Sequence, residues 1–314
     1  MSVLLAVTEW DPAPWLARFA ALAPDRTVVT PETSADPASI HYAVSWRHRP
    51  GGLAGLPNLK AIFSLGAGVD HVLADPRLPD VPVVRVVDPE LTARMSEWVV
   101  MQVLLHHRQF RRYDRQQAQK IWAEDEAQPV AAEVRVGILG LGELGLDAAR
   151  KLRILGFDVA GWTRSRKFLP DLASFHGPAG LDALLARTDI LVCLLPLTPD
   201  TRGLLNGSLF ARLAHDGRLG GPFLINAGRG GSQVEADILA ALDAGVLKGA
   251  SLDVFETEPL PASSPLWTHP NVYLSPHNSA ISSPEAIARY IVEQIVAFER
   301  GEPLRNVVDR ARGY

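Results

Sequence analysis

Short apolar runs alternate with amphipathic stretches along the whole chain. The first block of runs lies at 3–7, 27–30, 42–46, 59–65 and 83–87, separated by turns that contain Pro or Gly. A second block lies at 134–139, 157–162, 189–195, 223–227, 250–255 and 272–275. Strand-like runs that alternate with helical patterns are typical of parallel α/β sheets. The pattern predicts an α/β protein with two parallel sheets, each in a Rossmann-like or flavodoxin-like domain, and an active-site cleft between the domains.

The longer helical patterns mark the predicted domain boundaries. One runs from about 91 to 113 and leads into a polar stretch at 115–128, which we expect to be an exposed connection or arm. Another, at 284–300, follows the second block and is expected to return to the first domain. We therefore predict a discontinuous domain at 1–103 plus 281–314 and a second domain at 104–280.

Composition narrows the class of protein. The chain has 314 residues, 47% of them hydrophobic and 21% charged, which is ordinary for a folded protein of two domains. A formal net charge of −4 argues against binding to nucleic acid. The one cysteine, Cys193, lies in an apolar run and is expected to be buried and unreactive. Because the N-terminus lacks the pattern of a signal peptide and no apolar stretch reaches about 18 residues, we expect a cytoplasmic protein without membrane spans.

A glycine-rich turn follows the first strand of the second block. It reads Gly140-Leu-Gly142-Glu143-Leu144-Gly145 and opens a helical run that ends at Gly156. In such a turn the first glycine allows a sharp bend, the second lets a pyrophosphate approach the backbone, and the third lets helix and strand pack closely. The amides that open the helix, at Glu143 and Leu144, would face the phosphates. We interpret this unit as a dinucleotide-binding site.

The end of the next strand indicates which dinucleotide is bound. NAD-specific sites place a carboxylate there, about 20 residues after the turn, to bind the ribose 2′-hydroxyl. This chain instead has Thr163, Arg164, Ser165, Arg166 and Lys167. Cations and hydroxyls suit a 2′-phosphate. We predict that NADP(H) is preferred over NAD(H).

Several further motifs occur in a fixed order and carry a family resemblance. They are Ser64-Leu-Gly-Ala-Gly-Val-Asp70, the run 195–201, Asn226-Ala-Gly-Arg229-Gly230, Asp253-Val-Phe-Glu-Thr-Glu258-Pro259 and Pro276-His277. At these residues the chain resembles the D-2-hydroxyacid dehydrogenase family. The segments 241–245, 265–270 and 308–314 make it most similar to the glyoxylate/hydroxypyruvate reductase A branch. The resemblance implies NADPH-dependent reduction of small 2-oxo acids such as glyoxylate and hydroxypyruvate.

The chemistry of that reaction gives each catalytic residue a role. As hydride reaches the 2-oxo carbon, negative charge develops on the carbonyl oxygen, so a cation and a proton donor must face it. The resemblance places Arg229 on the carboxylate and carbonyl oxygen, and His277 as the general acid. Glu258 would pair with the second imidazole nitrogen and fix its tautomer. Glu256 is the competing carboxylate, but only Glu258 directly precedes Pro as the family pattern requires.

The resemblance also assigns residues that contact cofactor and substrate. Trp46, Ala67, Gly68 and Val69 are expected to bind substrate together with Arg229 and His277. The first domain is thereby the substrate-binding domain and the second the NADP-binding domain. Leu195, Pro196 and Thr201 are expected to form a cofactor wall, with Ala227 and Gly228 as further cofactor-binding residues. The family also implies that Asp253 contacts the nicotinamide carboxamide. No spacing of metal ligands emerges, so no metal is predicted.

Other interpretations remain open at this stage. A nucleotide-sensing protein, like the corepressors of the family, would share the fold and could keep the same three catalytic residues. A dehydrogenase for another acid, such as phosphoglycerate or formate, is a further alternative. The family also implies a homodimer, with the 115–128 arm as a participant. Glycine at 228, 230 and 231 further suggests that the loop carrying Arg229 is more flexible than in relatives.

Overall fold

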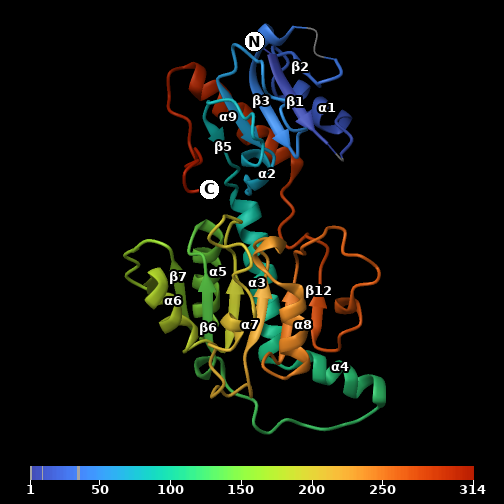
Figure 1. Ribbon diagram of the computed structural model, residues 1–314, viewed down its shortest axis with the longest axis vertical. Coiled ribbons are helices and arrows are strands. Elements are labelled where there is room, and N and C mark those ends of the chain that lie inside the picture. The colour runs from blue at the N-terminus through green and yellow to red at the C-terminus, as the bar shows by residue number, and fades with distance from the viewer. Residues whose placement is uncertain (1, 9, 34–35) are drawn as a thin grey trace. The chain divides into compact units, whose positions relative to one another are not determined.

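The computed structural model describes residues 2–8, 10–33 and 36–314 (Figure 1). The chain divides into two compact units, Met1–Leu91 with Ser282–Tyr314, and Thr92–Ile281. Each unit is built on one parallel sheet, which confirms the predicted α/β class. Both this division and the expected boundary at 103 fall inside helix α3, Pro89–His107.

The first unit contains a five-stranded sheet in the order β2-β1-β3-β4-β5. Its strands are β1 (Ser2–Val7), β2 (Val28–Val29), β3 (Ile40–Trp46), β4 (Ala61–Ser64) and β5 (Val83–Val84). Helices α1 (Ala13–Leu22), α2 (Asp70–Leu73) and α9 (Pro284–Glu299) and the short 3₁₀ turn η1 (Pro37–Ser39) complete this unit. Each of the five predicted runs of the first block contains residues of one of these strands.

Alternation along the strands explains how this unit packs. Val3 and Leu5 of β1 lie in one buried cluster and Leu4 lies in another, because successive side chains of a strand point to opposite faces. The first cluster also contains Phe19 of α1 and Ile291 of α9. Figure 1 shows α9, in red, beside the strands of this sheet. The last helix thus packs against the sheet of the first unit.

The second unit contains a seven-stranded parallel sheet in the order β12-β11-β10-β9-β6-β7-β8. Its strands are β6 (Arg135–Leu139), β7 (Asp158–Thr163), β8 (Ala173–His176), β9 (Ile190–Cys193), β10 (Phe223–Asn226), β11 (Gly249–Leu252) and β12 (Val272–Leu274). The sequence pattern missed β8. This strand lies at the edge of the sheet and none of its residues is buried, so it lacks the apolar run that marks the other strands.

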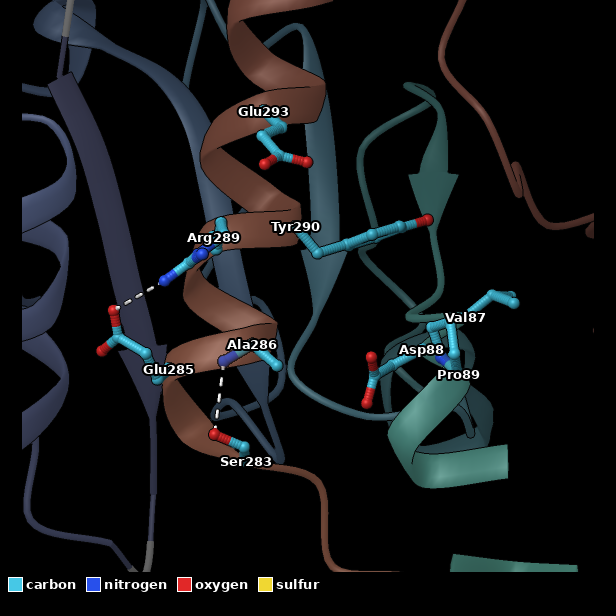
Figure 2. A pocket seen from close by; sticks show the side chains of 9 residues that line it. All are labelled: Val87, Asp88, Pro89, Ser283, Glu285, Ala286, Arg289, Tyr290 and Glu293. Atoms are coloured by element: carbon cyan, nitrogen blue, oxygen red, sulfur yellow. Dashed lines mark hydrogen bonds and ion pairs between the residues drawn. The ribbon is translucent and has the colours of Figure 1, made fainter. Parts of the chain in front are cut away.

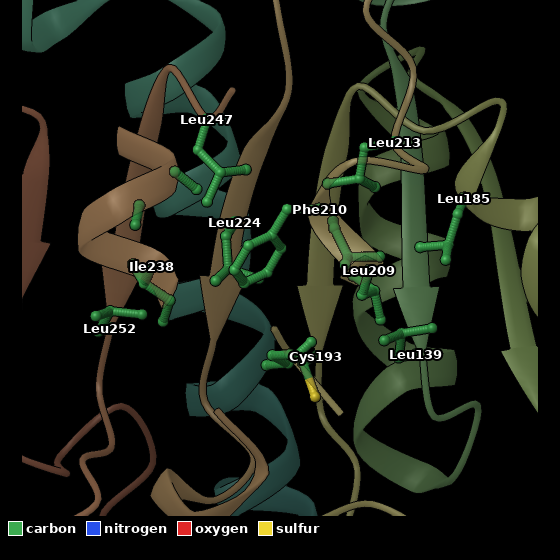
Figure 3. Close-up of a cluster of buried hydrophobic side chains, with 14 of the residues drawn as sticks. Leu139, Leu185, Cys193, Leu209, Phe210, Leu213, Leu224, Ile238, Leu247 and Leu252 are labelled. Atoms are coloured by element: carbon green, nitrogen blue, oxygen red, sulfur yellow. The ribbon is translucent and has the colours of Figure 1, made fainter. Parts of the chain in front are cut away.

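Helices cover both faces of the larger sheet. They are α3, α5 (Glu143–Ile154), α6 (Gly177–Leu185), α7 (Gly207–Phe210) and α8 (Glu235–Asp243). Short 3₁₀ turns of the same unit lie at Ala131–Glu133, Gly230–Ser232 and Pro265–Trp267. Residues of α6, α7 and α8 pack with Leu191 and Cys193 on one face, shown in Figure 3. Residues of α3 and α5 pack with Ile190 and Val192 on the other.

Cys193 is therefore part of the hydrophobic core, as predicted. Its side chain is fully buried, and this burial raises the pKa of the thiol to about 11. A thiol with so high a pKa is protonated near neutral pH and is a poor nucleophile.

The predicted helix at 91–113 is two helices. Helix α3 ends at His107, and α4 (Phe110–Gln119) begins after Gln109, whose φ of 54° interrupts the helical path. Gln128 donates a hydrogen bond from Nε2 to the carbonyl oxygen of His107 at 2.7 Å, which satisfies one of the carbonyls left at the end of α3. The polar stretch beyond Arg115 thus begins as helix, and α4 contains no buried residue.

A buried polar network joins α3 to the larger sheet. His106 Nε2 lies 2.8 Å from Ser251 Oγ, and that hydroxyl donates to Gln102 Oε1 at 2.7 Å. Burial lowers the pKa of His106 to about 3, so the imidazole is neutral in the folded protein. Among the described residues, no helix combines the length and apolar character needed to cross a membrane.

Candidate active site

The predicted catalytic and cofactor residues follow strands of one sheet. Gly140 follows β6, Arg164 follows β7, Leu195 follows β9, Asp253 follows β11 and His277 follows β12, while Arg229 lies just beyond β10. Because all strands of this sheet are parallel, their carboxyl ends meet at one edge. The order of the strands reverses between β9 and β6, and in open α/β sheets ligands bind at such a switch point.

The glycine turn has the geometry that each of its glycines predicts. Gly140 has a φ of +99°, a conformation that glycine adopts readily. A Cβ at Gly145 would lie 1.9 Å from the carbonyl oxygen of Gly140, so helix and strand approach too closely for any side chain. A Cβ at Gly142 would meet no atom within 4 Å, so the space beside the start of α5 is open. This arrangement fits a dinucleotide pyrophosphate against the amides of α5.

This difference between two glycines gives a paired prediction. Gly145→Ala is expected to lower the free energy of unfolding by about 3 kcal/mol, because a methyl group cannot be placed without moving the backbone. Gly142→Ala is expected to leave stability unchanged, because its φ of −78° suits alanine and its Cβ position is open. In the latter variant the Kd for NADPH is expected to rise by about tenfold or more, since the methyl occupies the pyrophosphate space. Calorimetry and a fluorescence titration measure the two effects; destabilisation of both variants alike would contradict this assignment.

The segment after β7 presents cations beside the glycine turn. Lys167 Nζ donates to the carbonyl oxygen of Leu141 at 2.9 Å, which ties this segment to the turn. The exposed Arg164 lies 4.0 Å from Asp200, and Ser165 and Arg166 are also exposed. Thr163 is buried and donates from Oγ1 to the carbonyl oxygen of Ser165 at 2.7 Å. Thr163 thus shapes the loop, while Arg164, Ser165 and Arg166 present polar groups to solvent.

The predicted cofactor wall is closely packed. Thr201 Oγ1 donates to the carbonyl oxygen of Pro196 at 2.7 Å and fixes the turn between them. A Cβ at Gly228 would lie 2.6 Å from the carbonyl oxygen of Leu195, so the loops after β9 and β10 are in backbone contact. Leu195 and Ala227 are both buried.

The loop that carries Arg229 is anchored on several sides. Buried Asn226 accepts from the amide of Gly228 at 3.0 Å and donates to Gln233 Oε1 at 2.8 Å. Gln233 in turn donates to the carbonyl oxygen of Val254 at 2.9 Å. A Cβ at Gly230 would lie 1.7 Å from the carbonyl oxygen of Phe255, so this glycine permits backbone contact. The expected flexibility of the loop is therefore opposed by close packing, and the side chain of Gln233, which the motif analysis missed, contributes to it.

His277 is paired with Glu258 and not with Glu256. His277 Nδ1 lies 2.9 Å from Glu258 Oε2, and the other carboxylate oxygen of Glu258 accepts from the amide of Phe255 at 3.1 Å. Glu256 instead accepts from the amide of Glu235 at 2.8 Å, at the start of α8. The imidazole of His277 is 40% exposed. With Nδ1 occupied by a carboxylate, Nε2 is the nitrogen left to exchange a proton with a ligand.

Asp253 holds the segment that carries His277. Its carboxylate is fully buried and accepts from Ser275 Oγ at 2.6 Å and from the amides of Asn278 and Ser279. Its carbonyl oxygen accepts from the amide of His277 at 2.8 Å. The φ of His277 is +51°, a conformation that is uncommon for residues other than glycine. Asp253 thereby supplies the bonds that fix His277, and the predicted contact with nicotinamide remains a prediction.

The predicted substrate residues of the first unit surround one turn. Ser64 Oγ donates to the carbonyl oxygen of Gly68 at 2.9 Å and accepts from the amide of Gly66 at 3.2 Å. Within the described parts of the chain, the amides of the half-buried residues Ala67 and Gly68 donate no hydrogen bond. Adjacent amides of this kind bind anions. Val69 is buried in the core of this unit, and Trp46 lies against Gly66.

A pocket of about 360 Å³ also lies in the first unit (Figure 2). Asp88, Pro89, Glu285 and Tyr290 are among its lining residues, and none of the predicted site residues is. Figure 2 shows the ion pair between Arg289 and Glu285 along α9. Over residues 2–8, 10–33 and 36–314, no group of three or more His, Cys, Asp or Glu side chains is arranged to hold a metal ion.

Fold and site together define a nicotinamide-dependent dehydrogenase. Residues 100–279 match the model of the D-isomer specific 2-hydroxyacid dehydrogenase family, NAD-binding domain. The chain belongs to the D-isomer specific 2-hydroxyacid dehydrogenase family and is an oxidoreductase, as its motifs predicted.

Similar proteins support this membership over nearly the whole chain. A glyoxylate/hydroxypyruvate reductase A of Klebsiella pneumoniae is 43% identical over 281 residues, which is 87% of either chain. The NADPH-dependent glyoxylate/hydroxypyruvate reductase of Sinorhizobium meliloti, solved with NADP and sulfate, is 51% identical, with a TM-score of 0.94 over 100% of this chain and 99% of that one. A probable 2-hydroxyacid dehydrogenase of Rhizobium etli, solved with NADP, HEPES and L(+)-tartaric acid, is 47% identical, with a TM-score of 0.95 and the same coverage.

Proposed function

We propose that this protein reduces small 2-oxo acids, such as glyoxylate and hydroxypyruvate, to 2-hydroxy acids with NADPH, giving the D isomer where the product is chiral. The observation that carries the proposal is the Glu258–His277 pair at the edge of the sheet where the glycine turn and the Arg229 loop also lie. The reductases of Klebsiella and Sinorhizobium that resemble the chain support the same reaction.

The roles of the three residues follow from where charge develops. Bound NADPH supplies the hydride that reduces the 2-oxo carbon. Arg229 holds the carboxylate and the carbonyl oxygen of the substrate and stabilises the growing negative charge. His277 Nε2 donates a proton to that oxygen, while Glu258 holds Nδ1 and stabilises the imidazolium before the transfer. In the reverse direction His277 Nε2 accepts the proton.

Three features support NADPH as the electron donor. The segment from Arg164 to Lys167 contains cations where an NAD-specific enzyme needs a carboxylate. The space beside Gly142 is open to a pyrophosphate. The Sinorhizobium and Rhizobium proteins are bound to NADP.

Removing Arg164 and Arg166 is expected to weaken the binding of NADPH but not that of NADH. In the double variant Arg164→Gln, Arg166→Gln we expect the Kd for NADPH to rise about a hundredfold, because each lost charge-assisted hydrogen bond costs about 1.5 kcal/mol. The Kd for NADH should hardly change, since NADH lacks the 2′-phosphate. Fluorescence titration measures both constants. The matched control is Arg150→Gln, Arg153→Gln, which removes two exposed cations from α5; an equal loss for both nucleotides in the Arg164/Arg166 variant would refute the assignment.

Initial rates of nicotinamide absorbance change test the reaction itself. With NADPH we expect turnover of glyoxylate and hydroxypyruvate, and slower turnover of pyruvate and phenylpyruvate. With NADH the kcat/KM values should be lower for every acid. A protein that binds NADPH but oxidises it with none of these acids would be a nucleotide sensor and not this reductase.

We also propose a cytoplasmic homodimer in which a second copy covers the arm at 115–128. Helix α4 has no buried residue, and Trp122 beyond it is 93% exposed. Burying such a ring against a partner contributes about 2 kcal/mol. We expect light scattering to give twice the chain mass of 34.1 kDa and Trp122→Asp to give a single chain; a wild-type mass of one chain would exclude the dimer.

A further inference from the structure

Four aromatic rings stack in a row in the first unit. Trp15 and Trp10 are nearly parallel with centroids 6.3 Å apart, and Trp10 and Trp46 stack at 4.8 Å with 15° between their planes. His71 covers Trp46 at 4.6 Å with a tilt of 54°. The Trp46 indole therefore contacts both Trp10 and His71. Trp15 is buried, whereas Trp10 is 42% exposed.

The row of rings meets the turn that contains Gly66, Ala67 and Gly68, whose adjacent amides can bind an anion such as the substrate carboxylate. A Cβ at Gly66 would lie 2.7 Å from Cζ3 of Trp46, so the indole edge rests on the backbone of this turn. The amides of Ala67 and Gly68 follow directly in the chain. Atoms attached to a carboxylate held by those amides are therefore close to the Trp46 ring.

The backbone on either side of Trp46 is fixed as well. The amide of Thr8 donates to the carbonyl oxygen of Trp46 at 3.2 Å. The hydroxyl of Thr8 donates to the carbonyl oxygen of Arg47. His48 is buried between Ser45 Oγ at 2.7 Å and Asp75 Oδ2 at 3.0 Å. With its backbone anchored, Trp10 stacked on its ring and His71 in contact with it, the Trp46 indole forms a rigid wall.

We propose that Trp10 is a specificity-determining positioning residue, which clamps the Trp46 indole so that the site accepts short 2-oxo acids and rejects long ones. This inference rests on the proposed function, and it adds the residue that sets the substrate size. Trp46 contacts the substrate, and Trp10 acts through Trp46. A bulky group at C3 of the substrate requires the indole to move, which breaks the stack with Trp10.

Trp10→Ala removes the ring stacked on Trp46 and is expected to let the site accept larger 2-oxo acids. We expect kcat/KM for phenylpyruvate relative to glyoxylate to rise by about tenfold, with most of the change in KM, as for other pocket substitutions that admit a larger group. Trp10→Phe keeps a ring in the stack and should retain the wild-type ratio. Trp267→Ala, which removes an indole that is 54% exposed in the second unit, is the matched control and should leave the ratio unchanged.

The outcomes separate this inference from the proposed reaction. A ratio that stays within about twofold of wild type in Trp10→Ala, or that shifts equally in Trp10→Phe, overturns the role of Trp10. If the wild-type protein reduces no 2-oxo acid, the reaction fails, and the stack is then tested with oxalate and phenyllactate as inert ligands in the presence of NADP⁺. We expect Trp10→Ala to shift their relative affinities in favour of phenyllactate, and unchanged relative affinities overturn the inference independently of turnover.

Discussion

Replacing His277 by asparagine is expected to lower kcat for glyoxylate reduction by about a thousandfold, because a positioned general acid contributes on the order of 10² to 10⁴ in rate. Asparagine is the replacement of choice because it tolerates the left-handed conformation that His277 adopts, with φ at +51°. The hydrogen bond from the amide of residue 277 to Asp253 should therefore remain. Steady-state rates with saturating NADPH measure the loss.

The control distinguishes a lost proton donor from a disturbed fold. His215→Asn changes an exposed histidine in the same unit and should leave kcat unchanged. The Kd of His277→Asn for NADPH should stay within about twofold of wild type, since the imidazole is assigned to the substrate. A His277→Asn variant that retains more than about a tenth of the wild-type kcat would exclude His277 as the general acid.

Replacing Arg229 by glutamine is expected to lower kcat/KM for glyoxylate by about a thousandfold, since loss of one donor to a developing oxyanion costs about 10² to 10³ and the carboxylate also loses its cation. The kcat/KM of Arg229→Lys should lie between those of Arg229→Gln and wild type, because lysine keeps the charge but not the planar pair of donors. Initial rates over a range of glyoxylate concentrations separate the effects on kcat and KM.

The structure supplies a control for this substitution. Arg218 lies in the exposed loop before β10, with its side chain 63% exposed and 3.9 Å from Glu133. Arg218→Gln removes a cation from the same unit and should leave kcat/KM unchanged. Equal kcat/KM values for Arg229→Lys and wild type would contradict paired hydrogen bonding by the guanidinium.

The sequence was most informative where a strand is buried and where a motif follows it. Strands such as β9 and β10 are wholly or largely buried, so their apolar runs were evident. Strand β8 could not be predicted from the sequence, because an edge strand with exposed residues has no apolar run. The interruption between α3 and α4 at Gln109 could not be predicted either. The helical pattern continues on both sides of it, and the hydrogen bond from Gln128 comes from later in the chain.

Sequence motifs predict the catalytic side chains of the site better than the residues that hold them in place. Glu258 was preferred over Glu256 from the Glu-Pro pattern, and the structure pairs Glu258 with His277. Gln233 could not be predicted to support the Arg229 loop, since its partners Asn226 and Val254 meet it only through the fold. The glycines of the Arg229 loop predict flexibility, although Gly230 permits contact with the backbone at Phe255. Local patterns report side-chain chemistry, whereas close backbone approach depends on tertiary packing.

The most direct test is the reduction of hydroxypyruvate by NADPH with analysis of the product. The loss of nicotinamide absorbance is followed to completion, and the product is then resolved by chiral chromatography. Our account predicts that each NADPH consumed yields one D-glycerate. The absence of NADPH oxidation, or L-glycerate as the product, would contradict it.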